Sequence, residues 1–230
     1  MFAPGDIISY LDMCVFEKVN LQRGMNFHIN GNISVILMSI RVGAPYADRI
    51  EDNGKTLIYE GHDISKVKDG PDPKTANQPK YNSNGTLTQN GLFYEAARDF
   101  VNGKTKAELV RVYEKIRSGI WVFVGVFRLV DAWIDNATMR NVFKFRLTLN
   151  DETAINNEGQ IDLDHNRLIP SSVKLAVWKR DKGRCTKCGS KDNLHFDHVI
   201  PYSKGGSSLV PENIQLLCAR HNLEKRDKIE

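Results

Sequence analysis

Residues 184–228 read RCTKCGSKDNLHFDHVIPYSKGGSSLVPENIQLLCARHNLEKRDK, and this stretch decides how the C-terminal part of the chain folds. Cys185 and Cys188 form a Cys-x-x-Cys pair, and Cys218 and His221 form a Cys-x-x-His pair downstream. Thiolates and an imidazole at this spacing are usual ligands of a tetrahedral structural zinc ion. The stretch therefore predicts a small domain that folds around zinc.

A second set of polar residues lies between and beside the zinc pairs. It consists, in order, of Asp197, His198, Pro201, Gly205, Gly206, Asn213 and Asn222. This order resembles the HNH nuclease family, in which two short strands and a helix surround one catalytic cation, the ββα-metal fold.

The resemblance implies a role for each polar residue. His198 corresponds to the general base, and Asp197 to a carboxylate ligand of the catalytic metal. Asn213 corresponds to the asparagine that holds the loop and orients the histidine. Asn222 stands where the family's last histidine stands, which makes this the HNN variant. Its amide oxygen and the Asp197 carboxylate are hard ligands, which favour Mg²⁺ or Mn²⁺.

Phosphodiester hydrolysis explains why these residue types occur together. The substrate is anionic, so a cation has to neutralise the developing charge and a base has to deprotonate the attacking water. The imidazole of His198 can serve as that base near neutral pH. Lys204, beside Gly205, is a candidate phosphate contact or a solvated turn residue. The alternative for the whole stretch is a zinc knuckle that only stabilises a binding module.

The remaining sequence predicts an α+β protein with a β-rich N-terminal domain. Apolar and aromatic runs bounded by turn residues predict strands at residues 33–40, 56–60, 109–113, 120–133 and 142–149. Helical spacing predicts helices at 4–21, 92–101 and 172–181, the last capped by Ser171, and residues 69–84 predict a long loop. The predicted domains are 1–150 and 171–230, joined by a polar linker at 151–170.

The N-terminal strand pattern resembles the SRA family. The matching segments are ISVILMSI at 33–40, PYADRIEDNGKTLIYEGHD at 45–63, LTQNG at 87–91 and the long segment from residue 108 to 133. This resemblance implies a twisted, PUA-like β-barrel that binds duplex DNA and flips 5-methylcytosine or a related base into a pocket. The family's Tyr-Asp-Gly motif is Phe123-Val124-Gly125 here, without the aspartate.

The same resemblance implies the residues of the base pocket. Tyr46 and Tyr59 would stack on the base, a contact worth roughly 1–3 kcal/mol. Asp48 would accept from the cytosine N4 amine, with Glu51 and Asp52 as the alternative carboxylates. Taken alone, the tyrosines are more typical of half-buried strand aromatics, and Asp48 of a residue that caps a turn. His28 and His62 are interpreted as structural histidines.

Composition and charge fit a cytoplasmic DNA enzyme. The chain of 230 residues has a net charge of +4, no signal pattern and no membrane-spanning apolar run. Residues 171–230 contain twelve Lys and Arg against seven Asp and Glu, as expected for a part that lies along phosphates. Three of the four cysteines have metal-binding spacing, and we expect the fourth, Cys14, to be a small core residue. This use of cysteine predicts a reducing compartment, the cytoplasm of a prokaryote.

These expectations combine into a type IV-like restriction endonuclease with structural Zn²⁺ and catalytic Mg²⁺ or Mn²⁺. Its partner would be double-stranded DNA that carries 5-methylcytosine or 5-hydroxymethylcytosine, and a homodimer would cut both strands. Two alternatives are a non-cleaving reader of modified DNA and a nuclease whose barrel recognises unmodified DNA, single-stranded DNA or RNA.

Overall fold

The structure is a computed structural model that describes residues 2–29, 33–40, 43–52, 55–68, 70–136, 139–150 and 169–229. In these ranges the chain forms, in order, β1 (Ile7–Ser9), α1 (Tyr10–Glu17), β2 (Met25–Ile29), β3 (Ile33–Met38), β4 (Arg49–Glu51), β5 (Thr56–Glu60), α2 (Gln89–Val101), β6 (Glu108–Arg117), β7 (Ile120–Asp135), β8 (Val142–Leu149), α3 (Ser171–Arg180), β9 (Leu194–His198), β10 (Ile214–Cys218) and α4 (Ala219–Lys225). Two short 3-10 helices, η4 (Tyr202–Lys204) and η5 (Pro211–Asn213), lie between β9 and β10. The predicted linker lies outside the described residues, except for its last two.

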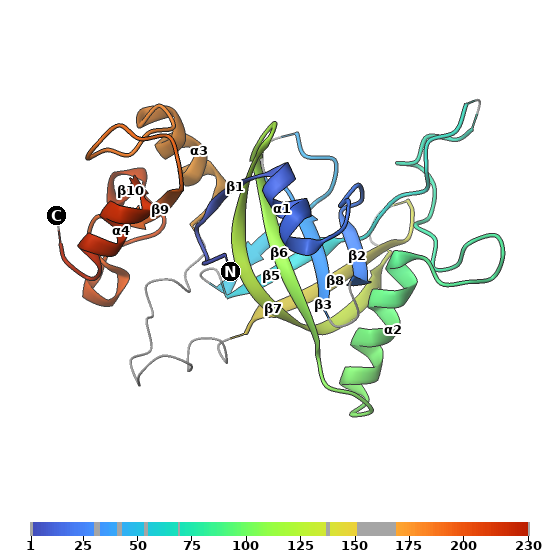
Figure 1. Cartoon of the computed structure of the whole chain (residues 1–230). Coiled ribbons are helices and arrows are strands. Elements are labelled where there is room, and N and C mark those ends of the chain that lie inside the picture. Colours follow the sequence, from blue (N-terminus) through green and yellow to red (C-terminus); the bar gives the residue numbers. More distant parts are fainter. Residues whose placement is uncertain are drawn as a thin grey trace.

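The N-terminal part is built on one eight-stranded sheet (Figure 1). Seven of its strands follow the order β2-β3-β6-β7-β8-β5-β4, and the eighth, β1, pairs with β7. The β3–β6 pair is parallel and the other pairs are antiparallel. The α+β class is confirmed, and β5 and β8 have the predicted bounds.

Most of the remaining elements were predicted with different limits. The helix expected at 4–21 is wrong in its first part, because residues 7–9 pair with β7 and the Ser9 hydroxyl then caps α1 by accepting from the Asp12 N–H. The Ser171 cap is also wrong: Pro170 holds the N-cap position of α3, and the Ser171 hydroxyl donates to Glu114. Strands β1, β2 and β4 have only three to five residues, too few to show a clear alternation.

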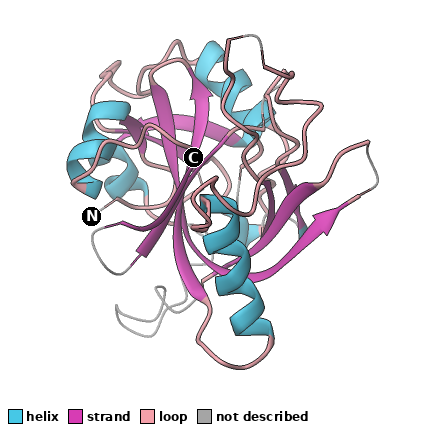
Figure 2. Cartoon of the chain, turned by 90° about the vertical axis from the view of Figure 1, so that its right-hand side faces the viewer, coloured by secondary structure: helices cyan, strands magenta, loops and turns pink. Residues whose placement is uncertain are grey.

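A continuous apolar core fills the curved sheet, and α2 packs across β7, β2 and β8 (Figure 2). Phe93 and Ala97 of α2 are completely buried in this core. The largest side chains that they join are Phe127, Phe145, Met25 and Ile36. The sixteen-residue strand β7 bends near Gly125, whose φ of +141° coincides with a register shift against β6. This bend helps a long strand to follow a curved sheet.

The C-terminal part has the ββα order that the motif predicts. Strands β9 and β10 form an antiparallel pair in which His198 lies opposite Ile214, and α4 follows β10 directly. β9 ends at His198, three residues before the turn at Pro201. No helix in the described ranges is both long and apolar enough to cross a bilayer.

Candidate functional sites

The two cysteine-containing pairs converge on one point. The ligand atoms of Cys185, Cys188, Cys218 and His221 all lie within 4.8 Å of one another. The Cys188 and Cys218 sulfurs are 3.8 Å apart, and His221 Nδ1 lies 3.4 Å from Cys185 Sγ and 3.3 Å from Cys218 Sγ. Tetrahedral ligands about 2.3 Å from a zinc ion would be separated by about 3.8 Å. The described cluster can therefore hold a metal ion of this size.

Nearby backbone N–H groups stabilise the thiolate form of Cys185, which is the form that binds a metal ion. Burial of the Cys185 thiol raises its pKa, but backbone N–H groups at Cys218, Cys188 and Lys187 outweigh burial and bring the pKa to about 6. A cysteine that ionises this readily can bind a cation at neutral pH without a large cost of deprotonation.

The second site lies where β9 meets α4. The Asp197 carboxylate faces this helix, because its Oδ2 is 3.0 Å from Lys225 Nζ. Lys225 is 1 % exposed, so the ammonium is enclosed by protein. Asn222 precedes it by three residues on α4, a spacing that places both residues on the same helix face. The structure thus directs Asp197 and the face of Asn222 toward one another.

His198, the predicted base, is buried and held by a serine. Its Nε2 lies 2.8 Å from Ser208 Oγ. Asp197 and His198 are neighbours on an extended strand, so their side chains leave on opposite sides. Neither the Ser208 contact of His198 nor the Lys225 contact of Asp197 was predicted, because neither pairing is marked by residue type or spacing in the sequence.

Asn213 fastens the loop that follows His198. Its side chain accepts from Ile200 N–H at 2.8 Å and donates to the carbonyls of Ile200 and Ser207 at 3.0 and 3.1 Å. Gly206 lies directly under this arrangement, and a Cβ there would be 1.7 Å from the Ile200 carbonyl oxygen. The closely packed Gly-Gly turn and the asparagine therefore form one rigid loop beside His198.

Lys204, the predicted phosphate contact, lies in η4 at the same loop. Its Nζ donates to the Asp227 backbone carbonyl at 2.6 Å. Since its side chain is still 43 % exposed, the ammonium is accessible to solvent in this arrangement.

A separate cavity of about 650 Å³ opens in the N-terminal sheet. The predicted base-pocket residues Tyr46, Asp48 and Tyr59 all line it, together with His62. The remaining lining residues come mainly from the segment around Gly24, from β3 and from the β6–β7 hairpin: Tyr10, Leu21, Gln22, Arg23, Gly24, Leu37, Met38, Ser39, Pro45, Lys115, Gly119 and Trp121. The alternative carboxylates Glu51 and Asp52 are not among them; they bond Arg49 and Thr56 instead.

The buried end of this cavity combines aromatic and polar groups. Tyr59 is 3 % exposed, and its hydroxyl lies 3.2 Å from His62 Nε2. The His62 ring is stacked on Tyr46 at a centroid distance of 5.7 Å. Asp48 accepts from the backbone N–H groups of Glu60 at 3.0 Å and Ser39 at 3.3 Å. His62, interpreted above as a structural histidine, thus contacts the Tyr59 hydroxyl and also lines the cavity.

Burial keeps these groups close to neutral. It raises the pKa of Asp48 to about 7, even though the N–H groups of Glu60 and Ser39 favour the carboxylate. Burial also lowers the pKa of His62 to about 4 and raises that of Tyr59 well above its usual value. Near pH 7 the cavity therefore contains a neutral imidazole, a neutral phenol and a carboxyl group close to half-protonation.

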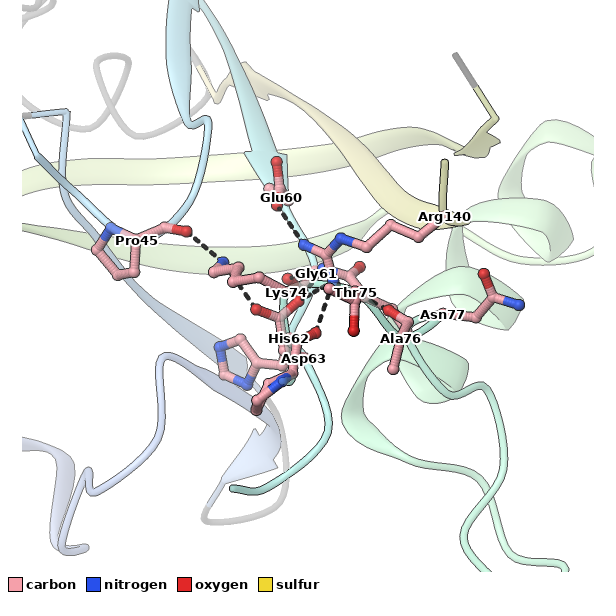
Figure 3. A network of polar contacts seen from close by, with 12 residues as sticks. Pro45, Glu60, Gly61, His62, Asp63, Lys74, Thr75, Ala76, Asn77 and Arg140 are labelled. Atoms are coloured by element: carbon pink, nitrogen blue, oxygen red, sulfur yellow. Dashed lines mark hydrogen bonds and ion pairs between the residues drawn. The ribbon is translucent and has the colours of Figure 1, made fainter. Parts of the chain in front are cut away.

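Figure 3 shows the polar contacts that fix part of the predicted loop, around Lys74 and Ala76, to Asp63 and Arg140. Arg140, two residues before β8, binds Asp63 at 2.6 Å, and Lys74 binds the same carboxylate at 2.7 Å (Figure 3). Lys74 also donates to the Pro45 carbonyl, and its Nζ lies 4.1 Å from the centre of the Tyr46 ring. Through Lys74, this irregular segment holds the cavity wall that carries Tyr46.

The C-terminal segment is similar in motif and in ββα order to HNH endonucleases. Residues 185–228 match the family model described as HNH endonuclease. The matched segment spans both metal-binding pairs and all four predicted catalytic residues.

Several solved structures are similar to this chain. The SUVH5 SRA domain in complex with hemimethylated CG DNA has a TM-score of 0.45 and 21% identity, covering 65% of this chain and 89% of that one. The same domain bound to fully hydroxymethylated CG DNA has a TM-score of 0.41 and 21% identity, covering 62% and 85%. ScoMcrA, a Type IV phosphorothioation-dependent restriction endonuclease, has a TM-score of 0.40 and 16% identity, covering 99% and 57%. The search of curated proteins found no match.

Proposed function

We propose that this protein is a modification-dependent DNA endonuclease. Its N-terminal sheet would take a flipped 5-methylcytosine or 5-hydroxymethylcytosine from duplex DNA, and its HNH module would hydrolyse a nearby phosphodiester bond. The observation that carries the proposal is the near-neutral, aromatic cavity around Asp48 in a chain that also contains an HNH module.

The cavity chemistry suits a nucleobase better than an anion. A base that leaves the helix loses stacking and pairing worth a few kcal/mol, which aromatic contacts and hydrogen bonds in a pocket can offset. Asp48 would accept from the N4 amine of cytosine, and Tyr46 with its stacked partner His62 would supply ring contacts. Arg23 is exposed and Lys115 is half-buried, so these two cations are suited to the phosphates of the flipped nucleotide.

In the HNH module, Asp197 and Asn222 would hold Mg²⁺ or Mn²⁺. Bound there, the cation supplies charge neutralisation at the scissile phosphate. His198 would accept the proton of the attacking water while Ser208 and the loop tied by Asn213 fix the imidazole. The Cys₃His cluster would hold a structural zinc ion and keep β10 and α4 in place around this centre.

Digestion of one plasmid in unmodified, cytosine-methylated and hydroxymethylated forms tests the proposal. Each form is incubated with Mg²⁺ or Mn²⁺, and with EDTA as a control. We expect metal-dependent cutting of a modified form only, and no cutting by His198→Ala, which should still bind modified DNA. Equal cutting of all three forms would leave the nuclease but refute the base reader; binding without cutting would indicate a reader with an inactive nuclease.

Each chain carries one HNH centre in its described residues, and one such centre cuts one strand. We therefore propose that duplex cleavage uses a homodimer. Linear plasmid should then form without an accumulating nicked intermediate, and sedimentation should show a dimer on modified DNA. Nicked circles that convert slowly to linear DNA, with a monomer in sedimentation, would contradict the dimer.

A further inference from the structure

The two parts of the chain share a buried interface, although the sequence suggests separate domains joined by a linker. In Figure 1, β1 lies between the sheet and the C-terminal elements. One apolar cluster contains Ile116 and Val122 from the β6–β7 hairpin together with Val173 and Val177 of α3. The same cluster continues into Phe196, Ile214 and Leu216 of the ββα module.

A buried polar cluster fixes α3 to the same hairpin. Glu114 of β6 accepts from the Ser171 hydroxyl and forms an ion pair with the Lys174 ammonium. Glu114 is 1 % exposed and Lys174 is 3 % exposed. A buried ion pair depends strongly on geometry, because neither charge can be satisfied by water if the partners separate.

The other face of this hairpin forms a wall of the base cavity. Lys115 and Trp121 line the cavity and are register partners, whereas the neighbouring pair Glu114 and Val122 faces the C-terminal part. Adjacent residues on a strand point to opposite faces, so one two-stranded segment contacts both sites.

The N-terminal segment adds a second connection. Ile7 packs in the cluster shared with the module, whereas Ile8 packs in the cluster of α1 with Trp121. One residue earlier, Asp6 forms a β-bridge with His195 of β9 and binds its Nδ1 at 2.6 Å. His195 is only three residues from His198 on the same strand.

From this arrangement, and on the basis of the proposed function, we infer that the base cavity and the HNH centre form one rigid unit that cuts at a fixed distance from the modified base. The β6–β7 hairpin and β1 would determine that distance, because they are the shared wall of both sites. Glu114 and Lys174 act as positioning residues: they touch neither the base nor the scissile phosphate.

The inference is tested by mapping cuts at nucleotide resolution on a duplex with a single modified cytosine. For the wild-type protein we expect one main cut position per strand. Lys174→Glu places two carboxylates in the interface and should spread the cuts over many positions. The charge-reversed double variant Glu114→Lys/Lys174→Glu should restore the main position. Glu108→Gln is the matched control, because Glu108 lies on β6 but pairs with His28, away from α3.

Calorimetry provides a readout that does not require DNA. The wild-type protein should unfold in one transition, and Lys174→Glu in two, with the sheet and the module melting separately. If Lys174→Glu fails to fold, Glu114→Gln offers a milder disruption of the same contact. Scattered wild-type cuts, or an unchanged cut pattern in a variant with two transitions, would overturn the inference. Cutting that ignores the modification would instead refute the proposed function, while the calorimetric result would still stand on its own.

Discussion

Replacing Asp48 with Asn should remove a pH dependence of stability that originates in the base cavity. Asp48 is 8 % exposed, and burial raises its pKa from 3.8 to about 7 in the folded protein. Between these two values the folded state keeps the proton while the unfolded state has lost it. The folded state therefore binds more protons than the unfolded state, and stability must fall as the pH rises through this interval.

The size of the effect follows from the interval that an experiment can cover. Between pH 5 and pH 7 the folded carboxyl is mainly protonated and the unfolded one is ionised, and each pH unit corresponds to about 1.4 kcal/mol. Because the slope decreases as the folded carboxyl approaches half-protonation at pH 7, the wild-type protein should lose about 2 kcal/mol relative to Asp48→Asn over these two units. Above the folded-state pKa of about 7 the difference should become constant.

Urea unfolding of both proteins at pH 5, 6, 7 and 8 measures this difference. Other titrating groups are common to the two proteins, so their contributions cancel when the free energies of unfolding are subtracted. Loss of one backbone hydrogen bond in the variant would shift the whole difference by about 1–3 kcal/mol without changing its slope. A difference that stays flat between pH 5 and pH 7 would refute the argument that burial controls this carboxyl group.

Three further predictions concern the pocket and the metal centres. Gly24→Ala would place a Cβ 2.7 Å from both Tyr59 Oη and His62 Nε2, so it should reduce the preference for modified DNA about tenfold in competition binding; an unchanged preference would place the base elsewhere. Cys188→Ser should make β10 and α4 sensitive to limited proteolysis while α2 and β7 stay resistant, and a chelator should reproduce this on the wild-type protein; a resistant variant would contradict a structural zinc ion. Lys225→Met should destabilise the metal-free protein by roughly 3–5 kcal/mol, because the Asp197 carboxylate loses its buried ion-pair partner. Added Mn²⁺ should then raise the free energy of unfolding more in this variant than in the wild type. An equal increase in both proteins would argue against Asp197 as a metal ligand.

The sequence was most informative where the chemistry is local. Cys185 and Cys188 can be recognised as a ligand pair because a metal site restricts residue types and their spacing together. Asp197 and His198 were recognisable for the same reason. Their partners were not: Ser208 and Lys225 acquire their roles only because the loop and α4 fold back onto β9.

The N-terminal part was predicted less completely because its contacts are non-local. Long strands such as β7 and β8 carry enough apolar residues to be found, but β2 and β4 do not. The cavity joins residues from segments that are more than 90 positions apart, such as Leu21 and Trp121. No window along the sequence contains such a site, so only an overall family resemblance could point to it.

The predicted linker at 151–170 does not by itself say how the two flanking parts of the chain are arranged. The polar composition of residues 151–170 predicts a segment that connects two domains, and it leaves their relative mobility open. Independence, however, depends on what the flanking surfaces bury. Here α3 begins by placing Ser171 and Lys174 on the buried Glu114, and Ile116 joins the core of the ββα module. A buried charge pair and an apolar cluster at the same junction cost free energy to expose, so the module is held against the sheet by its packing, whatever the composition of the linker.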